Sequence, residues 1–548
     1  MEKKRMKLFF FGVAGLLGIL GFRLFSIQMV HGEELAAAAF RQQRTEITGM
    51  DRRGVIVDRN GVPLTGQGTE YLCLVPKQNA DKGFRRAAER AGGERRGANS
   101  GDYAVYAFET YDAEFAARMT EQYGAYFIEN GKRYSDSQPA AHVIGYINPY
   151  DDCGVSGIEK ELDAMLVSNR EKLYGITARD GTLLAGFPLI GGGKSGDEKI
   201  ILTIDSRLQA IAEESLRKSA FNGAVLILES KTGEILALAS APEYNPNRVE
   251  KYLHSEQSEL LNKCTQGEYP PGSVFKIIVA AAALENGITD SNGRPVDENT
   301  VFYCNGKETL SGIEIGCSTG GKNGHGRITL RDAFAYSCNC AFIQLGQRTG
   351  AEKILEMAEK FGLGTPPLSE LPEVRSGNLP SVRDAAGDGI GNLSIGQGTL
   401  LATPLQIARL TNVIACGGTD TGMTLIRKSG EEEKGSEKAH TDIISKKSAE
   451  ILTEMMKDTA RYGTARGIDP VVHPAGKTGS AESSIGGNAI VHGWFTGFFP
   501  AEDPKWTVTV LMENGRSGRA AAVPVFEEII RAMREESFLS FPLEPEDS

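Results

Sequence analysis

The chain of 548 residues has few histidines and no excess of positive charge. Its formal net charge is −11, with 60 Lys and Arg against 71 Asp and Glu, which argues against a nucleic-acid partner. None of the seven histidines falls in a ligand spacing such as His-Glu-x-x-His. The sequence therefore predicts neither a metal site nor a cofactor.

Long apolar segments are also scarce, and the one that stands out lies at the amino terminus. Four basic residues precede fifteen apolar or glycine residues at positions 8–22, and the apolar character resumes after Arg23 through Val30. Fifteen residues at ~1.5 Å each are too short for a ~30 Å hydrocarbon core, but Arg23 can extend its charge to the interface. Residues 8–30 are therefore predicted to span a membrane.

This segment is predicted to be a retained anchor rather than a cleaved signal peptide, because no small-x-small cleavage site directly follows Phe22. The basic flank at residues 1–7 places the amino terminus in the cytoplasm and the remainder of the chain outside the cell membrane. A glycine recurs at every third position from Gly12 to Gly21. Such a stripe permits close helix contact, although glycine is also common in membrane helices.

A serine and a lysine stand one helical turn apart in the segment 270–276, which reads Pro-Pro-Gly-Ser-Val-Phe-Lys. Two prolines and a glycine before Ser273 indicate that it lies in the first turn of a helix. Residues three apart share a helix face, so Lys276 would lie beside the Ser273 hydroxyl, and its apolar neighbours would lower the pKa of its amine. This arrangement pairs a nucleophile with a general base.

The spacing alone is not specific, because Ser215 and Lys218 share it. What distinguishes Ser273 is that two further motifs follow it, Ser337-Cys338-Asn339 and then Lys477-Thr478-Gly479-Ser480. Three elements in this order form the serine, second serine and Lys-Thr-Gly set of acyl-serine transferases.

An earlier Lys-Thr-Gly triplet, at residues 231–233, is interpreted differently. It separates two short apolar runs, 224–228 and 235–238, and precedes Ser273 in the chain. Two such runs joined by a polar stretch with a glycine predict a hairpin, of which this triplet is the turn.

Together the three ordered motifs resemble the transpeptidase domain of class B penicillin-binding proteins. The resemblance includes Tyr269, the Gly-Gln-Gly segment 396–398 and the segment 492–497. Upstream, residues 53–61 and 154–159 are similar to the amino-terminal module of the same family. The resemblance thus covers nearly all of the chain after the first thirty residues.

The expected fold is α+β: a penicillin-binding/β-lactamase-like transpeptidase domain, preceded by a transmembrane helix and an extended β-rich amino-terminal module. Apolar strand candidates lie at both ends of the catalytic segment, which predicts a mostly antiparallel sheet with the central helices over one face. The predicted divisions are a cytoplasmic tail at 1–7, an anchor at 8–30, a pedestal or dimerisation-like module at 31–197, the transpeptidase domain at 198–538 and an acidic tail at 539–548.

The resemblance implies peptidoglycan cross-linking by D,D-transpeptidation, with D,D-carboxypeptidase activity as a side reaction and β-lactam antibiotics as covalent inhibitors. Ser273 would attack the penultimate D-Ala carbonyl of a stem peptide with Lys276 as base, and Ser337 would relay the proton to the leaving amine. Backbone N–H groups of Ser273 and Ser480 would form the oxyanion hole, worth ~3–4 kcal/mol per donor elsewhere. The remaining implied roles are substrate binding by Asn339, Thr478, Gly479 and Ser480, and positive potential from Lys477.

Eight cysteines in an exported chain raise the question of disulfides. Cys304 and Cys317 flank a polar loop that is short enough for a local bridge, and a disulfide between them is one of two outcomes that the sequence leaves open. Cys338 and Cys340 flank Asn339 and cannot easily both pair.

Two alternatives to a transpeptidase remain at this point. A penicillin sensor or serine β-lactamase shares the motifs, but a β-lactamase needs no long anchored module. A catalytically idle scaffold of a cell-wall complex has no need of intact motifs. No paired-acid glycosyltransferase motif appears in the sequence, so we expect the chain to rely on a separate, membrane-embedded glycan polymerase.

Overall fold

The computed structural model describes residues 2–26, 44–46, 53–96, 103–148, 153–168, 172–176, 190–192, 199–318, 323–429, 432–433, 440–485 and 488–539. Its centre is a five-stranded antiparallel sheet in the order β11-β10-β22-β21-β20. The strands are β10 (Gly223–Glu229), β11 (Ile235–Ala241), β20 (Ala475–Ile485), β21 (Asn488–Phe499) and β22 (Trp506–Met512). The sheet is thus assembled from both ends of the catalytic segment, as the sequence predicts.

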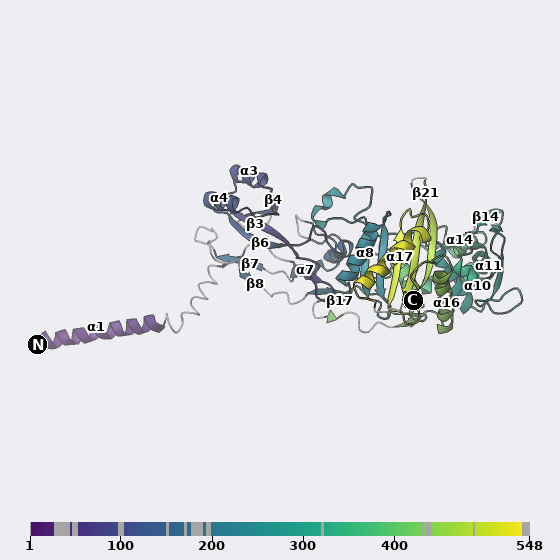
Figure 1. Ribbon diagram of the computed structural model, residues 1–548. Helices are drawn as coiled ribbons and strands as arrows, with labels where there is room; N and C mark the ends of the chain where they lie inside the picture. Colours follow the sequence, from purple (N-terminus) through teal and green to yellow (C-terminus); the bar gives the residue numbers. More distant parts are fainter. Residues whose placement is uncertain are drawn as a thin grey trace, which may run out of the picture.

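Both faces of this sheet are covered by helices (Figure 1). On one face, α8 (Ser206–Lys218) and α17 (Val523–Glu535) pack against Val225, Ile227 and Phe495. On the other face lie the central helices, with α9 (Lys276–Glu285), α11 (Asn339–Thr349), α12 (Ala351–Lys360), α15 (Pro404–Ala415) and α16 (Lys446–Arg461) the longest. Because β10 is buried on both faces, it has a continuous apolar sequence rather than an alternating one.

Shorter elements complete the catalytic region. The helices are α10 (Leu330–Ala335), α13 (Val382–Ala385) and α14 (Gly389–Ser394). Two small hairpin-like sheets pair β12 (Val301–Cys304) with β15 (Gly326–Thr329), and β13 (Lys307–Leu310) with β14 (Ile313–Gly316). A third pairs β16 (Thr419–Asp420) with β19 (Thr441–Asp442).

The amino-terminal region has its own four-stranded antiparallel sheet, in the order β4-β5-β3-β6. The strands are β3 (Gly68–Pro76), β4 (Glu94–Arg96), β5 (Tyr103–Phe108) and β6 (Tyr126–Lys132), with α3 (Lys82–Arg90) and α4 (Ala113–Tyr123) packed on one face. In a second sheet, β7 (Lys172–Ile176) lies between β1 (Arg44–Glu46) and β8 (Ile190–Gly192) and pairs with both in antiparallel fashion. The expected boundary at residues 197–198 stays a prediction.

A third sheet joins this region to the catalytic one. β2 (Ile56–Val57) pairs in parallel with β9 (Ile200–Leu202), which pairs with β17 (Ile426–Ser429), followed by β18 (Glu432–Glu433). The two upstream family motifs also meet, because the buried Arg53 guanidinium donates to the buried Glu159 carboxylate at 3.1 Å. Short helices α5 (Ala141–Ile144), α6 (Gly157–Glu161) and α7 (Asp163–Ser168) surround that pair.

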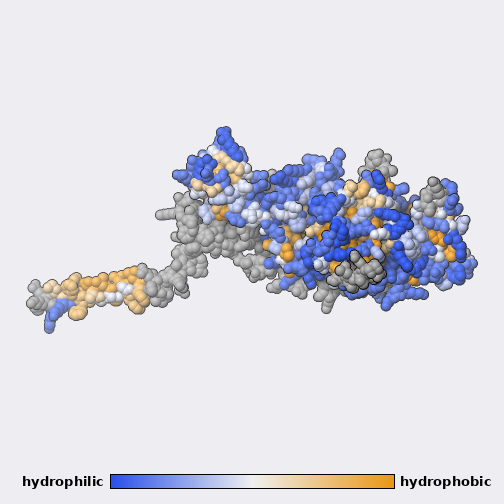
Figure 2. Space-filling view, viewed as in Figure 1, coloured by the Kyte–Doolittle hydropathy of each residue, from blue (hydrophilic) through white to orange (hydrophobic). Residues whose placement is uncertain are grey.

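The amino-terminal helix α1 (Glu2–Phe25) includes an apolar stretch of 20 residues, Met6–Phe25, and its surface is uncovered and strongly hydrophobic (Figure 2). A helix of this length and composition fits membrane anchoring. It begins earlier than the predicted anchor at residue 8, because the basic residues at 3–7 continue the same helix. Residues 27–30 of the predicted anchor, and all but Leu539 of the predicted acidic tail, lie outside the described residues.

Candidate active site

Ser273 lies in a 3-10 turn, η3 (Gly272–Phe275), that leads directly into α9. Gly272 begins the turn with φ 54°, and a Cβ there would come within 2.7 Å of the Ser480 carbonyl oxygen on β20. The Gly272 N–H donates to the Gly396 carbonyl at 2.9 Å, so the Gly-Gln-Gly segment supports the turn from its other side. The first motif is therefore wedged between this segment and strand β20.

Lys276, the predicted base, is fully buried and is held by the second motif. Its Nζ donates to the Ser337 carbonyl at 2.8 Å, to Ser337 Oγ at 3.2 Å and to Asn339 Oδ1 at 2.8 Å. Burial lowers the pKa of the Lys276 amine from its usual value near 10.5 to about 8. Among the described residues, the Ser273 hydroxyl makes no hydrogen bond, and catalytic contacts of this kind often tighten only when substrate binds.

The second motif owes its shape to the junction of α10 and α11. Ser337 has a φ of 59°, in the left-handed region that few residues other than glycine adopt. This conformation turns the chain between the two helices, and α11 begins at Asn339, whose Nδ2 donates to the Gly316 carbonyl at 2.9 Å. Ser337 and Asn339 can thereby both reach the amine of Lys276.

The third motif lies within β20, at the edge of the five-stranded sheet. Lys477 is fully buried, and burial together with the nearby charge of Lys276 holds the pKa of its amine well below the usual value. The hydroxyls of Thr478 and Thr464 are 2.5 Å apart, and Ser480 Oγ accepts from the Gly518 N–H at 3.2 Å.

Gly479 explains how β20 approaches the turn that carries Ser273. A Cβ at this position would lie 3.0 Å from the Pro271 carbonyl oxygen, from Val274 Cγ2 and from Trp494 Cβ. Only glycine fits without displacing a neighbour. The structure therefore brings all three motifs, separated by up to 207 residues of chain from Ser273 to Ser480, to one place beside an open sheet edge.

The two segments that share a motif's sequence but were not expected to be catalytic both lie away from the candidate active site. Ser215 is buried within α8, and Lys218 forms an ion pair with Glu528 at 2.8 Å. The triplet at 231–233 is the turn between β10 and β11, as predicted, and Lys231 pairs with Asp503 at 2.7 Å.

The sequence left open whether Cys304 and Cys317 pair. Cys304 and Cys317, both within the part of the chain that is described, are not joined by a disulfide. Their thiols instead face a common centre with His325 and Cys338. This cluster was not predicted from the sequence, because neither the histidine spacing nor the cysteine spacing alone indicates it. The available signal was Cys338 inside the second motif.

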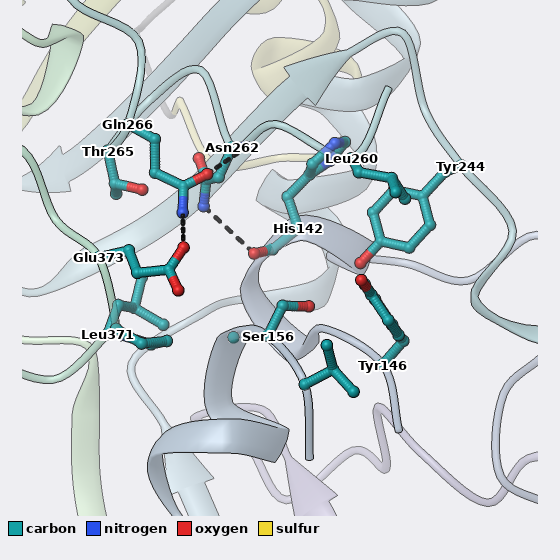
Figure 3. Close-up of a pocket in the computed structure, with 13 residues that line it drawn as sticks. His142, Tyr146, Ser156, Tyr244, Leu260, Asn262, Thr265, Gln266, Leu371 and Glu373 are labelled. Atoms are coloured by element: carbon teal, nitrogen blue, oxygen red, sulfur yellow. Dashed lines mark hydrogen bonds between the residues drawn. The ribbon is translucent and has the colours of Figure 1, made fainter. Parts of the chain in front are cut away.

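A cavity of about 270 Å³ lies between the amino-terminal and catalytic regions (Figure 3). It is lined by His142, Tyr146 and Ser156 on one side and by Asn262, Gln266 and Glu373 on the other. On that second side, Gln266 Nε2 donates to Glu373 at 3.3 Å. None of its lining residues belongs to the three motifs, so this cavity is separate from the candidate active site.

Comparison with known proteins agrees with this geometry. Residues 223–531, more than half of the chain, match the family described as the penicillin binding protein transpeptidase domain. The peptidoglycan D,D-transpeptidase PbpA of Mycolicibacterium smegmatis is 32% identical over 73% of this chain and 83% of its own length. The peptidoglycan D,D-transpeptidase MrdA of Acinetobacter baumannii is 28% identical over 93% of this chain and 85% of its own length.

Solved structures share the fold over most of the chain. The penicillin-binding protein PBP2 of Helicobacter pylori, in complex with MreC, has a TM-score of 0.70 at 23% identity and covers 90% of this chain and 99% of its own. The family match and these relatives agree with the meeting of the three motifs at the edge of the sheet. The chain therefore belongs to the class B penicillin-binding proteins and is a serine-type peptidoglycan D,D-transpeptidase.

Proposed function

We propose that this transpeptidase works through an acyl-enzyme on Ser273, with Lys276 as the general base. The observation that carries the proposal is the burial of the Lys276 amine among Ser337 and Asn339. With a pKa of about 8, roughly one amine in ten is neutral at pH 7 and able to accept a proton. An ordinary surface lysine would be neutral far less often.

In the first half-reaction, Ser273 Oγ bonds to the penultimate D-Ala carbonyl carbon of a stem peptide, and its proton passes to Lys276. The carbon–nitrogen bond to the terminal D-Ala then breaks, and the leaving amine takes a proton by way of Ser337. In the second half, an amine of another stem peptide attacks the ester and releases Ser273. Attack by water instead would give the D,D-carboxypeptidase side reaction.

The substrate would lie along the edge of β20. An extended peptide can add to a sheet edge through main-chain hydrogen bonds, and β20 pairs with β21 on one side only. The hydroxyls of Thr478 and Ser480 would bind the terminal carboxylate, Lys477 would supply positive potential, and Asn339 would bind a substrate amide. Family members more often have Thr at position 480, so we expect Ser480 to alter affinity rather than chemistry.

Labelled penicillin tests the nucleophile. After incubation of the full-length protein, peptide mapping by mass spectrometry should find the label on Ser273, and Ser273→Ala should abolish it. Ser215→Ala is the matched control, since it changes the other Ser-x-x-Lys serine and should leave labelling intact. Label retained in the Ser273→Ala protein would overturn the assignment, and rapid release of hydrolysed antibiotic would indicate a β-lactamase instead.

The amino terminus is proposed to lie in the cytoplasm and the catalytic region outside, following the basic residues at the start of α1. The chain would then cross-link glycan made by a membrane-embedded polymerase. Two features support this partner: the glycine stripe of α1, and a β-rich region between α1 and the transpeptidase domain. The PBP2 of Helicobacter pylori, a structural neighbour, forms a complex with MreC, so accessory partners of this kind are part of the proposal.

Replacing Gly15 and Gly18 with leucine tests the partnership. Added side chains would separate α1 from a neighbouring helix, so co-purification with the polymerase should weaken. Penicillin labelling of the same protein should be unchanged, because α1 contributes nothing to the three motifs. Equal recovery of the polymerase with the double variant would contradict the role of the stripe, and glycan polymerisation by the purified chain alone would contradict the need for a partner.

A further inference from the structure

Four side chains that commonly bind metals converge beside the second catalytic motif. Cys304 ends β12, Cys317 follows β14, His325 precedes β15, and Cys338 is the N-cap of α11. Their ligand atoms all lie within 4.8 Å of one another. Four donors from four different turns and strand ends therefore face one point.

The separations between these donors match a tetrahedral metal centre. Cys317 Sγ lies 3.7 Å from Cys338 Sγ and 3.5 Å from His325 Nδ1. Zinc bonds of ~2.3 Å to sulfur and ~2.0 Å to nitrogen place tetrahedral ligands about 3.8 Å apart for two sulfurs and about 3.5 Å apart for sulfur and nitrogen. The donors thus have the spacing that such an ion imposes.

The chemistry of the donors and their burial favour zinc. Cys304 and Cys338 are fully buried, Cys317 is 6% exposed, and His325 is half-buried. Three sulfurs and one imidazole suit Zn²⁺, whereas calcium, magnesium and manganese prefer oxygen ligands. All four coordination positions would be filled by the protein, which is typical of a structural site rather than a catalytic one.

We propose that Cys304, Cys317, His325 and Cys338 form a structural site for one Zn²⁺ ion. Binding releases the three thiol protons to solvent and leaves His325 as a neutral donor through Nδ1. This proposal departs from the sequence prediction of no metal site, which rested on the histidines alone.

The site would act on the catalytic motif by position. Cys338 stands between Ser337 and Asn339, the two residues whose side chains accept from Lys276. A metal bond to Cys338 would tie the start of α11 to the β12–β15 pair and hold Ser337 in its left-handed conformation. The ion touches no substrate, so its donors are positioning residues. This effect on acylation rests on the proposed function, whereas the metal site does not.

Metal content of the purified full-length protein tests the site directly. Prepared under reducing conditions, the wild-type chain should contain about one zinc per chain by elemental mass spectrometry. After zinc removal, added Co²⁺ should give the visible absorption of a tetrahedral cobalt thiolate complex. His325→Ala and Cys304→Ser should each lower cobalt affinity at least tenfold. A wild-type chain with neither retained zinc nor the cobalt spectrum overturns the proposal, as does an intact mass that shows an internal disulfide among these cysteines.

Two matched variants define the donor set. Cys153→Ser alters an exposed cysteine outside the cluster and should bind cobalt like the wild type. Cys340→Ser alters a buried thiol on the same helix as Cys338 that interacts with Cys304, Cys317 and Cys338 and so competes with His325 for the fourth position. With His325 as the donor, this variant should retain the metal. Loss of metal from Cys340→Ser with retention in His325→Ala would overturn the donor set.

A measurement on the wild-type chain avoids the question of whether a variant folds. Removal of zinc by a chelator should lower the thermal unfolding midpoint, and one equivalent of Zn²⁺ should restore it. Removal of zinc should also slow penicillin acylation, and added Zn²⁺ should reverse this effect. An unfolding midpoint that does not respond to zinc would contradict a structural role, whereas a changed midpoint without any change in acylation would contradict only the positioning of Ser337 and Asn339.

Discussion

At the scale of the residue, a serine followed by a lysine three positions later occurs twice in this chain, in two different environments. Lys276 is fully buried and its amine meets three acceptors, whereas Lys218, in the same spacing from a serine, is half exposed and pairs with Glu528. Burial without a neighbouring carboxylate lowers the pKa of Lys276, because the charged form loses hydration. Environment, and not spacing, separates the proposed base Lys276 from the surface cation Lys218.

The pKa of Lys276 predicts how acylation depends on pH. The folded protein lowers it from about 10.5 to about 8, so the amine is mostly charged below pH 8 and mostly neutral above it. The second-order rate of penicillin acylation should therefore rise about tenfold per unit well below pH 8 and level off above it. Stopped-flow measurement from pH 6 to 9 checks this; a flat profile between pH 6 and 7.5 would remove Lys276 as the base.

Lys276→Arg should lose acylation at every pH in this range. A guanidinium stays charged and cannot accept the serine proton. Lys218→Arg is the matched control and should acylate like the wild type, because Lys218 is paired at the surface. Acylation of Lys276→Arg at the normal rate would show that another group takes the proton.

At the scale of the element, the contact between β20 and η3 depends on the absence of a side chain at Gly479. Gly479→Ala would push the strand away from the turn that carries Ser273, at a cost of about 1–3 kcal/mol. Acylation should slow by tenfold or more. Ser483→Ala, farther along the same strand, is the control and should have little effect. Unchanged acylation of Gly479→Ala would mean that the spacing between β20 and η3 does not matter.

Some helices and strands could be predicted from the sequence, and the contacts between them could not. The α+β fold, which the family resemblance implies, is confirmed, and so are the strands from both ends of the domain and the hairpin at 231–233, which follow from apolar patterns. The order of the motifs identified the three segments that meet. Which groups hold Lys276 could not be predicted, because the left-handed Ser337 depends on packing between α10 and α11. The cysteine and histidine cluster was missed for a similar reason, since its members are adjacent only in the fold.

At the scale of the whole molecule, a buried ionic cluster joins the two upstream family motifs. Glu159 is fully buried and accepts from Arg53 at 3.1 Å, from Arg133 at 2.7 Å and from the Tyr134 hydroxyl at 3.0 Å. Glu159→Gln would remove the carboxylate that Arg53 and Arg133 share and would leave Arg53 paired with Asp163 at 2.7 Å, so the free energy of unfolding should fall by at most about 3–5 kcal/mol.

Denaturant unfolding checks this expectation, with Lys160→Ala as the neighbouring control. Lys160 pairs with Glu373 at 2.7 Å, but both side chains are largely exposed, so its loss should change the free energy of unfolding by less than about 1 kcal/mol. Equal stabilities for the Glu159→Gln and wild-type proteins would show that the cluster is not a structural joint.

Arg59 connects this same region to the catalytic sheet at one particular edge. It pairs with Glu234 at 2.9 Å and Glu229 at 3.5 Å, which flank the turn between β10 and β11. In the strand order β11-β10-β22-β21-β20, that turn and the strand with Lys477 lie on opposite sides of the sheet. Four hydrogen-bonded strand interfaces separate β11 from β20 in that order. Along the sheet, a displacement at Arg59 would therefore have to cross all four interfaces before it reached the edge that carries Lys477.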